Sequence, residues 1–240
     1  MNIETKERAF TAGPKGKSAQ YIAKVIELDE LHQAHSLRHK IFAEELKWVE
    51  ESCLKLEFDR YETDSVSFGV FDQEHVLKAS LRLVPSSRPY MLERDFPFLV
   101  RDGHQIRKSP DAAEITRLCV EMEARKTIID YPFGENSISL LLYRSLYQWC
   151  RCHEVRYLYM VVERKVFRLL NRLGFPSEAI GDSVKMPDGV TAIAALLDWD
   201  AFDELHRHKN PLMHKWFLAE DVLSIQLFPP QSQMQLLETG

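Results

Sequence analysis

The sequence predicts an α/β protein, of α+β arrangement, built on a mixed central sheet. Short β-branched runs alternate with stretches of helical periodicity in the order β-α-β-β-β-α-β-α-(β)-β, and a helical tail follows. One strand carries Glu114 and Arg117 among apolar neighbours, and strict alternation would send them to opposite faces. For both side chains to reach one cleft, this strand needs a bulge or must splay from its neighbour.

The expected strands share β-branched and apolar content between polar boundaries. They cover 21–28, 64–71, 76–84, 115–120, 157–162 and 190–199. The expected helices have apolar residues at helical spacing, and one ends at Gly174. They cover 31–42, 137–152, 165–173, 200–208 and 211–223. Residues 47–63 hold no clear element, and the long loop after residue 84 is apolar enough to fold back on the core.

Three regions are expected along the chain. Residues 1–19 are rich in glycine, proline and lysine and form an N-terminal arm. Residues 20–200 form the main domain, and residues 201–240 form a C-terminal helical extension. A chain of 240 residues is long enough for one such domain and an appendage.

Composition excludes several classes of protein. Hydrophobic content of 45% and charged content of 28% are ordinary for a soluble globular protein, and the net charge of −5 argues against nucleic-acid binding. No apolar run has the length of a membrane span or a signal peptide. The four cysteines lack zinc spacing, so we expect no metal, reduced thiols and a cytoplasmic location.

Six charged residues of alternating sign come from one helix, one loop and two strands. They are Arg38, Asp59, Glu62, Arg82, Glu114 and Arg117. Such residues can satisfy one another around a polar cleft that holds an amine and a carboxylate. The alternative is a set of structural ion pairs, and Phe42 and Trp48 taken alone would be core residues.

Several blocks, in order, resemble the N-acyl-homoserine lactone synthases, the autoinducer synthases of bacterial quorum sensing. They are Arg38-x-x-x-Phe42, Trp48, Glu57-x-Asp59-x-Tyr61-Glu62, residues 81–85, 89–92 and 96–97, Glu114-x-x-Arg117 and residues 166–174. The resemblance covers roughly residues 21–200. Glu62 departs from it, because the family usually has aspartate there, and the tail after residue 200 is additional to the usual length.

The resemblance implies a GNAT-like three-layer acyltransferase fold. The sheet would open between the Glu114 strand and the strand at 157–162 to admit a thioester arm. The family moves a fatty acyl group from acyl carrier protein to S-adenosylmethionine, closes the lactone and releases methylthioadenosine. No cofactor is then needed: S-adenosylmethionine is the small-molecule amine substrate, and the phosphopantetheine arm of the carrier presents the donor.

The resemblance and the chemistry together suggest roles in a catalytic centre. An α-ammonium must lose a proton before its nitrogen attacks a thioester, and Glu114 is the expected base. Asp59 and Arg117 complete the expected catalytic set. The expected substrate-binding residues hold the ammonium, ribose, carboxylate and nucleotide, and they are Arg38, Phe42, Trp48, Glu62, Arg82 and Thr116.

An excess of positive charge between residues 144 and 172 suggests a docking surface for an acidic carrier protein. The expected docking residues are Arg144, Arg151, Arg164, Lys165, Arg168 and Arg172. A solvated basic face is the alternative.

Two other functions stay open from the sequence. N-acyl amino acid synthases and exosortase-associated N-acyltransferases resemble this family and use another amine. The length of the chain and Glu62 favour that alternative, whereas Phe42, Trp48 and the block at 89–92 disfavour it. A non-catalytic acyl-binding module would show a broken ion cluster, and here the cluster is nearly complete.

Overall fold

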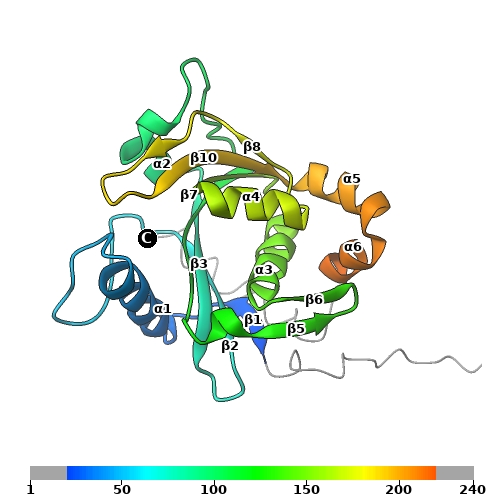
Figure 1. Cartoon of the computed structure of the whole chain (residues 1–240), viewed down its shortest axis with the longest axis horizontal. Coiled ribbons are helices and arrows are strands. Elements are labelled where there is room, and N and C mark those ends of the chain that lie inside the picture. The colour runs from blue at the N-terminus through cyan, green and yellow to red at the C-terminus, as the bar shows by residue number, and fades with distance from the viewer. Residues whose placement is uncertain (1–20, 220–240) are drawn as a thin grey trace, which may run out of the picture.

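The computed structural model describes residues 21–219. The arm expected over residues 1–19 and the end of the tail, residues 220–240, lie outside the described residues. The main sheet has the order β1-β2-β3-β4-β7-β10-β8, and β9 pairs with β10 (Figure 1). Its strands are β1 (Ile22–Val25), β2 (Val66–Phe71), β3 (Leu77–Pro85), β4 (Ala112–Val120), β7 (Tyr157–Glu163), β8 (Ser177–Ala179), β9 (Val184–Lys185) and β10 (Thr191–Asp198).

Helices lie on both faces of this sheet, which gives three layers (Figure 1). The helices are α1 (Leu31–Arg38), α2 (Met91–Arg94), α3 (Ser139–Cys152), α4 (Arg164–Leu173), α5 (Trp199–Lys209) and α6 (Pro211–Leu218). Short turns of other helix types are η2 (His39–Glu45), η3 (Pro97–Leu99) and η4 (Ala124–Lys126). Helix α1 packs on β2, β3 and β4, whereas α3 and α4 cover the other face. The predicted mixed α/β architecture is confirmed.

Two local features differ from the sequence-based expectation. The helix expected over 31–42 changes at His39 into the π-helical turn η2. The loop expected before α3 contains a two-stranded sheet of its own, β5 (Ile128–Tyr131) and β6 (Gly134–Ser137). Each of these strands has four residues, too few for alternation to separate them from a loop.

Strand β4 shows both the bulge and the splay that the sequence predicted as alternatives. Against β3, Ser80 pairs with Cys119 but Arg82 pairs with Thr116, so β4 has one extra residue between these pairs. The extra residue brings Arg117 into the left-handed region at φ 54°. On its other side, β4 pairs with β7 in parallel only over 112–115, and the two strands then separate. The central strands therefore open at the end that carries Thr116 and Arg117.

The described part of the C-terminal extension packs on α3 through aromatic side chains. The rings of Tyr147 and Trp199 lie 5.0 Å apart, and those of Phe202 and Phe217 lie 4.9 Å apart. Tyr147 also donates a hydrogen bond of 2.6 Å to Asp203 Oδ1. Helices α5 and α6 thereby close the α3 side of the core. Within residues 21–219, no helix is long and apolar enough to cross a membrane.

Gly174 ends α4 and contacts His206 of α5, so a substitution there tests the packing of these two helices. It has φ +90°, its carbonyl lies 2.7 Å from His206 Nε2, and a Cβ at this position would collide with the His206 ring. Gly189 has a similar φ of +88° and open space around it. We expect Gly189→Ala to lose about 1–2 kcal/mol of unfolding free energy from backbone strain. Gly174→Ala should lose clearly more in the same urea titration. Equal losses would show that His206 moves aside without cost.

Candidate active site

The first part of the site is a buried ion network centred on Glu57. Arg38 Nε donates to Glu57 Oε2 at 2.5 Å, and Arg117 Nη2 donates to Oε1 at 2.9 Å. The side chain of Arg38 is 1% exposed and that of Glu57 is 5% exposed. Charges this deeply buried are tolerated because they are paired and hydrogen-bonded. Glu57 therefore fixes helix α1 to the bulge of β4.

Arg82 extends this network from β3 into the loop that follows α1. Its Nη1 and Nη2 atoms bind the two oxygens of Asp59 at 2.6 and 2.8 Å, a bidentate pair. Nη1 also lies 2.6 Å from Glu62 Oε1, and Nε donates to Thr116 Oγ1 at 3.0 Å. Arg38 Nη2 reaches the same Glu62 oxygen at 2.6 Å. The carboxylates of Glu57, Asp59 and Glu62 thus balance the guanidiniums of Arg38, Arg82 and Arg117.

Asp59 and Glu62 are held in their ionised forms. Burial alone raises the pKa of each carboxyl group, but hydrogen bonds and charges of neighbouring side chains outweigh it. Arg82 and Arg117 lower the pKa of Asp59, and His35 and Arg38 lower that of Glu62. Their low pKa values make these two carboxylates weak bases and good acceptors of hydrogen bonds from a cation.

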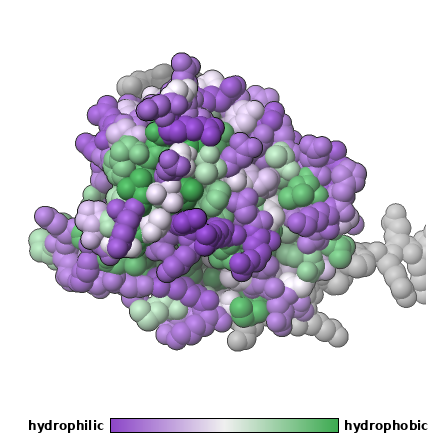
Figure 2. Space-filling view, turned by 45° about the horizontal axis from the view of Figure 1, so that its top comes forward, coloured by the Kyte–Doolittle hydropathy of each residue, from purple (hydrophilic) through white to green (hydrophobic). Residues whose placement is uncertain are grey.

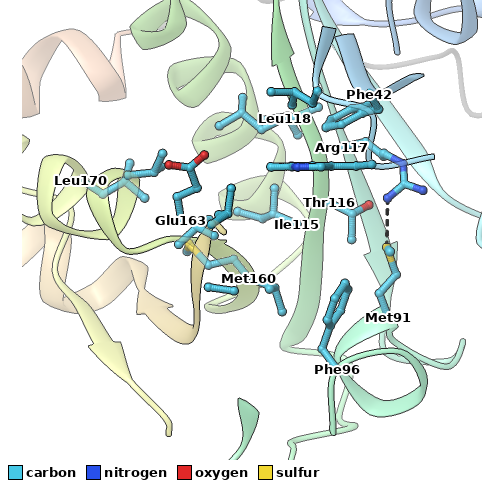
Figure 3. A pocket seen from close by; sticks show the side chains of 18 of the residues that line it. Phe42, Met91, Phe96, Ile115, Thr116, Arg117, Leu118, Met160, Glu163 and Leu170 are labelled. Carbon is cyan, nitrogen blue, oxygen red and sulfur yellow. Dashed lines mark hydrogen bonds between the residues drawn. The ribbon is translucent and has the colours of Figure 1, made fainter. Parts of the chain in front are cut away.

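Glu114 has the opposite electrostatic character. Burial raises its pKa to about 7, although hydrogen bonds from two backbone N–H groups oppose this shift. Those donors are Leu92 N at 2.8 Å and Met91 N at 2.7 Å. Glu114 therefore anchors the first turn of α2 to β4. The Met91 sulfur in turn lies 3.5 Å from Arg117 Nη1 (Figure 3).

A cavity of about 640 Å³ lies between the separated strands. One arm is formed by side chains from η2 and α2 and by the β4 bulge, among them Phe42, Met91, Phe96 and Arg117 (Figure 3). The second arm runs toward Glu163 and Leu170 at the opposite end of the view. We assign to this second arm the apolar lining residues that belong to, or pack against, the core cluster beside α4: Leu118, Tyr143, Leu146, Val166, Leu170, Phe175, Leu197 and Trp199. In the space-filling view, apolar surface also gathers left of centre among hydrophilic side chains (Figure 2).

The sequence-predicted residues meet here, in two groups. Four of them line the cavity: Phe42, Trp48, Thr116 and Arg117. The Phe42 and Trp48 rings stack 6.0 Å apart, and the Arg117 guanidinium lies 5.4 Å from the centre of the Phe42 ring. The remaining five do not line this cavity: Arg38, Arg82 and Glu114 are buried, and the partly exposed Asp59 and Glu62 pair with the arginines of the network.

A family model described as autoinducer synthase matches residues 23–206. The chain belongs to the autoinducer synthase family. It is therefore an enzyme of quorum-sensing signal synthesis.

Named relatives agree with this assignment. An acyl-homoserine-lactone synthase of Aeromonas hydrophila is 28% identical over 150 residues, which are 62% of this chain and 70% of the relative. One of Acinetobacter baumannii is 28% identical over 166 residues, 68% of this chain and 89% of the relative.

Solved structures confirm the fold. BjaI, described as a CoA-dependent acyl-homoserine lactone synthase and solved with SAM and isopentyl-CoA, aligns with a TM-score of 0.66 at 22% identity. The alignment covers 78% of this chain and 88% of BjaI. TofI, solved with an inhibitor and MTA, aligns at 0.61 and 21% identity, over 77% of this chain and 96% of TofI.

The basic residues of this autoinducer synthase fall on two helices with different surroundings. Arg164, Lys165, Arg168 and Arg172 are exposed on α4. On α3, Arg144 Nη2 donates to the Ala219 carbonyl at 2.7 Å, and Arg151 lies 3.0 Å from Asp200. Contacts with the C-terminal helices thus engage both α3 arginines, so the docking hypothesis centres on α4.

Sequence reasoning gave no role to several residues of the site. Glu57 was part of the matching blocks, but nothing in the sequence shows that it joins two arginines. Met91 and Asp95 line the cavity because α2 folds back against β4. His35 lies 3.5 Å from Glu62 and one helical turn before Arg38, a spacing that could have indicated it.

The network makes a testable claim about stability. Arg38→Met should lower the unfolding free energy by about 3–5 kcal/mol, because it removes a guanidinium from Glu57 and Glu62 and leaves one negative charge of the network uncompensated. Arg88→Met is the matched control, since Arg88 is 49% exposed and pairs with the exposed Asp64. That control should change the unfolding free energy by less than about 1 kcal/mol. Chemical denaturation of both variants measures these unfolding free energies. A loss of stability in Arg38→Met as small as that of the control would mean that the network is hydrated.

Proposed function

We propose that this autoinducer synthase transfers a fatty acyl group from acyl carrier protein to the amino group of S-adenosylmethionine and closes the product to an N-acyl-homoserine lactone. The observation that carries the proposal is one cavity with two chemically different arms. The arm beside the ion network suits a small charged amine, and the apolar arm under α4 suits an acyl chain. The two arms meet at Thr116 and Arg117 on the β4 bulge.

The charged arm fits a substrate that carries a carboxylate, an ammonium and a sulfonium. Arg117 lines the cavity and offers its guanidinium to the carboxylate. The ionised Asp59 pairs with Arg117 at 2.8 Å, and Glu62 shares Arg82 with it; these two partly exposed carboxylates would receive the ammonium and ribose. The stacked rings of Phe42 and Trp48 would meet the adenine or the sulfonium, since a cation is attracted to an aromatic face.

Glu114 is the proposed base because its pKa of about 7 suits proton removal near neutral pH. An ionised carboxylate offers about four lone-pair sites, and the two backbone bonds use one on each oxygen. A further acceptor position on each oxygen remains for the proton, which would reach this buried carboxylate through a water molecule, because Glu114 does not line the cavity. The freed amine attacks the thioester carbonyl, and the phosphopantetheine thiol leaves. The substrate carboxylate then attacks the carbon next to the sulfonium, which closes the lactone and expels methylthioadenosine.

Glu114→Gln tests this role. The wild-type kcat/KM should rise with pH through about 7, because only the ionised Glu114 accepts a proton. The variant should lose at least about 100-fold in kcat and should show no rise over that range. Steady-state assays from pH 5.5 to 8.5 supply the measurement.

Glu93→Gln is the control for helix anchoring, since Glu93 Oε2 accepts the Tyr90 N–H at 2.7 Å in the same turn. Comparable losses in both variants would make α2 positioning, and not proton transfer, the function of Glu114.

We propose the use of a carrier protein because α4 exposes a group of positively charged side chains. Arg168 and Arg172 lie four apart and so on one helix face. Reversing both to Glu should lower kcat/KM for acyl carrier protein about ten-fold at low salt, while a short acyl-pantetheine reacts as before. The control is the double variant Lys40→Glu with Lys126→Glu, which makes the same change in net charge at exposed sites on other elements. Unchanged carrier use in the α4 variant would move docking elsewhere, and efficient turnover of acyl-CoA without a carrier would make CoA the donor.

The activity itself is tested by mass spectrometry of the purified enzyme with S-adenosylmethionine and acyl carrier protein loaded with fatty acyl groups. We expect an acyl-homoserine lactone and methylthioadenosine in equal amounts. An acyl amino acid formed from a free amino acid would instead identify an N-acyl amino acid synthase. Acyl binding without any product would identify a non-catalytic module.

A further inference from the structure

The apolar arm of the cavity follows helix α4 along its length. Val166 and Leu170 lie four residues apart on one face of α4 and both line the arm, as does Phe175 just beyond the helix. A helix of ten residues is about 15 Å long. The arm thus begins at the gap between β4 and β7, beyond the Ile115–Met160 pair, passes Glu163 and Leu170, and closes on Phe175, Leu197 and Trp199. Leu197 pairs with Leu158, at the end where the two central strands remain joined.

Tyr143 lies at this closed end and has an unusual environment. Its ring contacts the Phe175 ring edge-on, with the centroids 5.2 Å apart. Burial alone raises the pKa of its phenol to about 12. Within residues 21–219, its hydroxyl has no hydrogen-bond partner. Ser177, another polar residue of the lining, already donates its hydroxyl to the Phe175 carbonyl at 3.1 Å.

Tyr143 is only partly buried, and water reaches its hydroxyl in the free enzyme; losing that water without gaining another partner would cost about 1–3 kcal/mol. A plain hydrocarbon chain in the arm would exclude water from the Tyr143 hydroxyl and give it nothing to bond. An acyl group with an oxygen at its far end would supply that bond. The arrangement therefore penalises the first kind of chain and favours the second.

We propose that Tyr143 selects acyl groups that carry a hydrogen-bonding oxygen at the end distant from the thioester. The proposal rests on the function above, because it names the class of acyl group that the same site accepts. The aromatic rings around Tyr143 provide apolar contact for the carbons next to that oxygen.

The test compares matched pairs of thioesters, straight-chain acyl groups and their ω-hydroxy forms, over a series of chain lengths. Each is supplied on acyl carrier protein and on CoA. The wild-type enzyme should show kcat/KM about ten-fold or more higher for the hydroxylated member at the best length. Tyr143→Phe should remove that preference by lowering kcat/KM for the hydroxylated member relative to the plain chain.

Two further measurements keep the test decisive. Tyr131→Phe removes a buried tyrosine hydroxyl that donates to the Ser137 carbonyl at 3.0 Å, outside the cavity, and it should leave the donor preference unchanged. Thermal unfolding of Tyr143→Phe should match the parent, since the hydroxyl makes no bond within residues 21–219 of the free enzyme.

A wild-type preference for plain chains, or an unchanged preference in Tyr143→Phe, overturns the proposal. The absence of acylated product from every donor would instead contradict the proposed function.

Discussion

The site depends on the left-handed backbone of Arg117. An L-residue in this conformation costs about 1–2 kcal/mol, and the surrounding contacts must supply it. The guanidinium bonds to Glu57 and Asp59 and lies near the Phe42 ring, so the strained residue is held from several elements. Because of the bulge, Thr116 and Arg117 both turn toward the ion network, and β4 stops pairing with β7. One backbone irregularity therefore creates both the charged wall and the opening beside it.

Charge neutrality explains how such a network survives inside the domain. Each carboxylate of the network, Glu57, Asp59 and Glu62, meets at least one guanidinium, and the short distances make these charge-assisted hydrogen bonds. Pairing holds Asp59 and Glu62 ionised, whereas Glu114, bonded only to backbone N–H groups, has a pKa near 7. Carboxylates in one region thus divide into cation acceptors and a candidate base.

Much of this arrangement was readable from the sequence. A carboxylate and a guanidinium on one apolar strand predicted a bulge or a splay, because strict alternation cannot bring both to one cleft, and the structure has both. The blocks around Arg38, Asp59 and Arg82 predicted a shared site. The sequence did not show that Arg38 and Arg82 are buried and do not line the cavity, because helix rotation and side-chain length decide this. The contacts of Arg144 and Arg151 with the C-terminal segment were also hidden, since they depend on how α5 and α6 pack.

The central claim is that one cavity holds both substrates across the β4 bulge. A crystal structure with S-adenosylmethionine and a non-transferable acyl-pantetheine analogue tests it most directly. The account predicts the amine and the thioester carbon in contact beside Thr116 and Arg117, with the acyl chain beneath α4 and its end near Tyr143. An acyl chain bound outside the gap between β4 and β7, or an amine held away from Arg117, would contradict it.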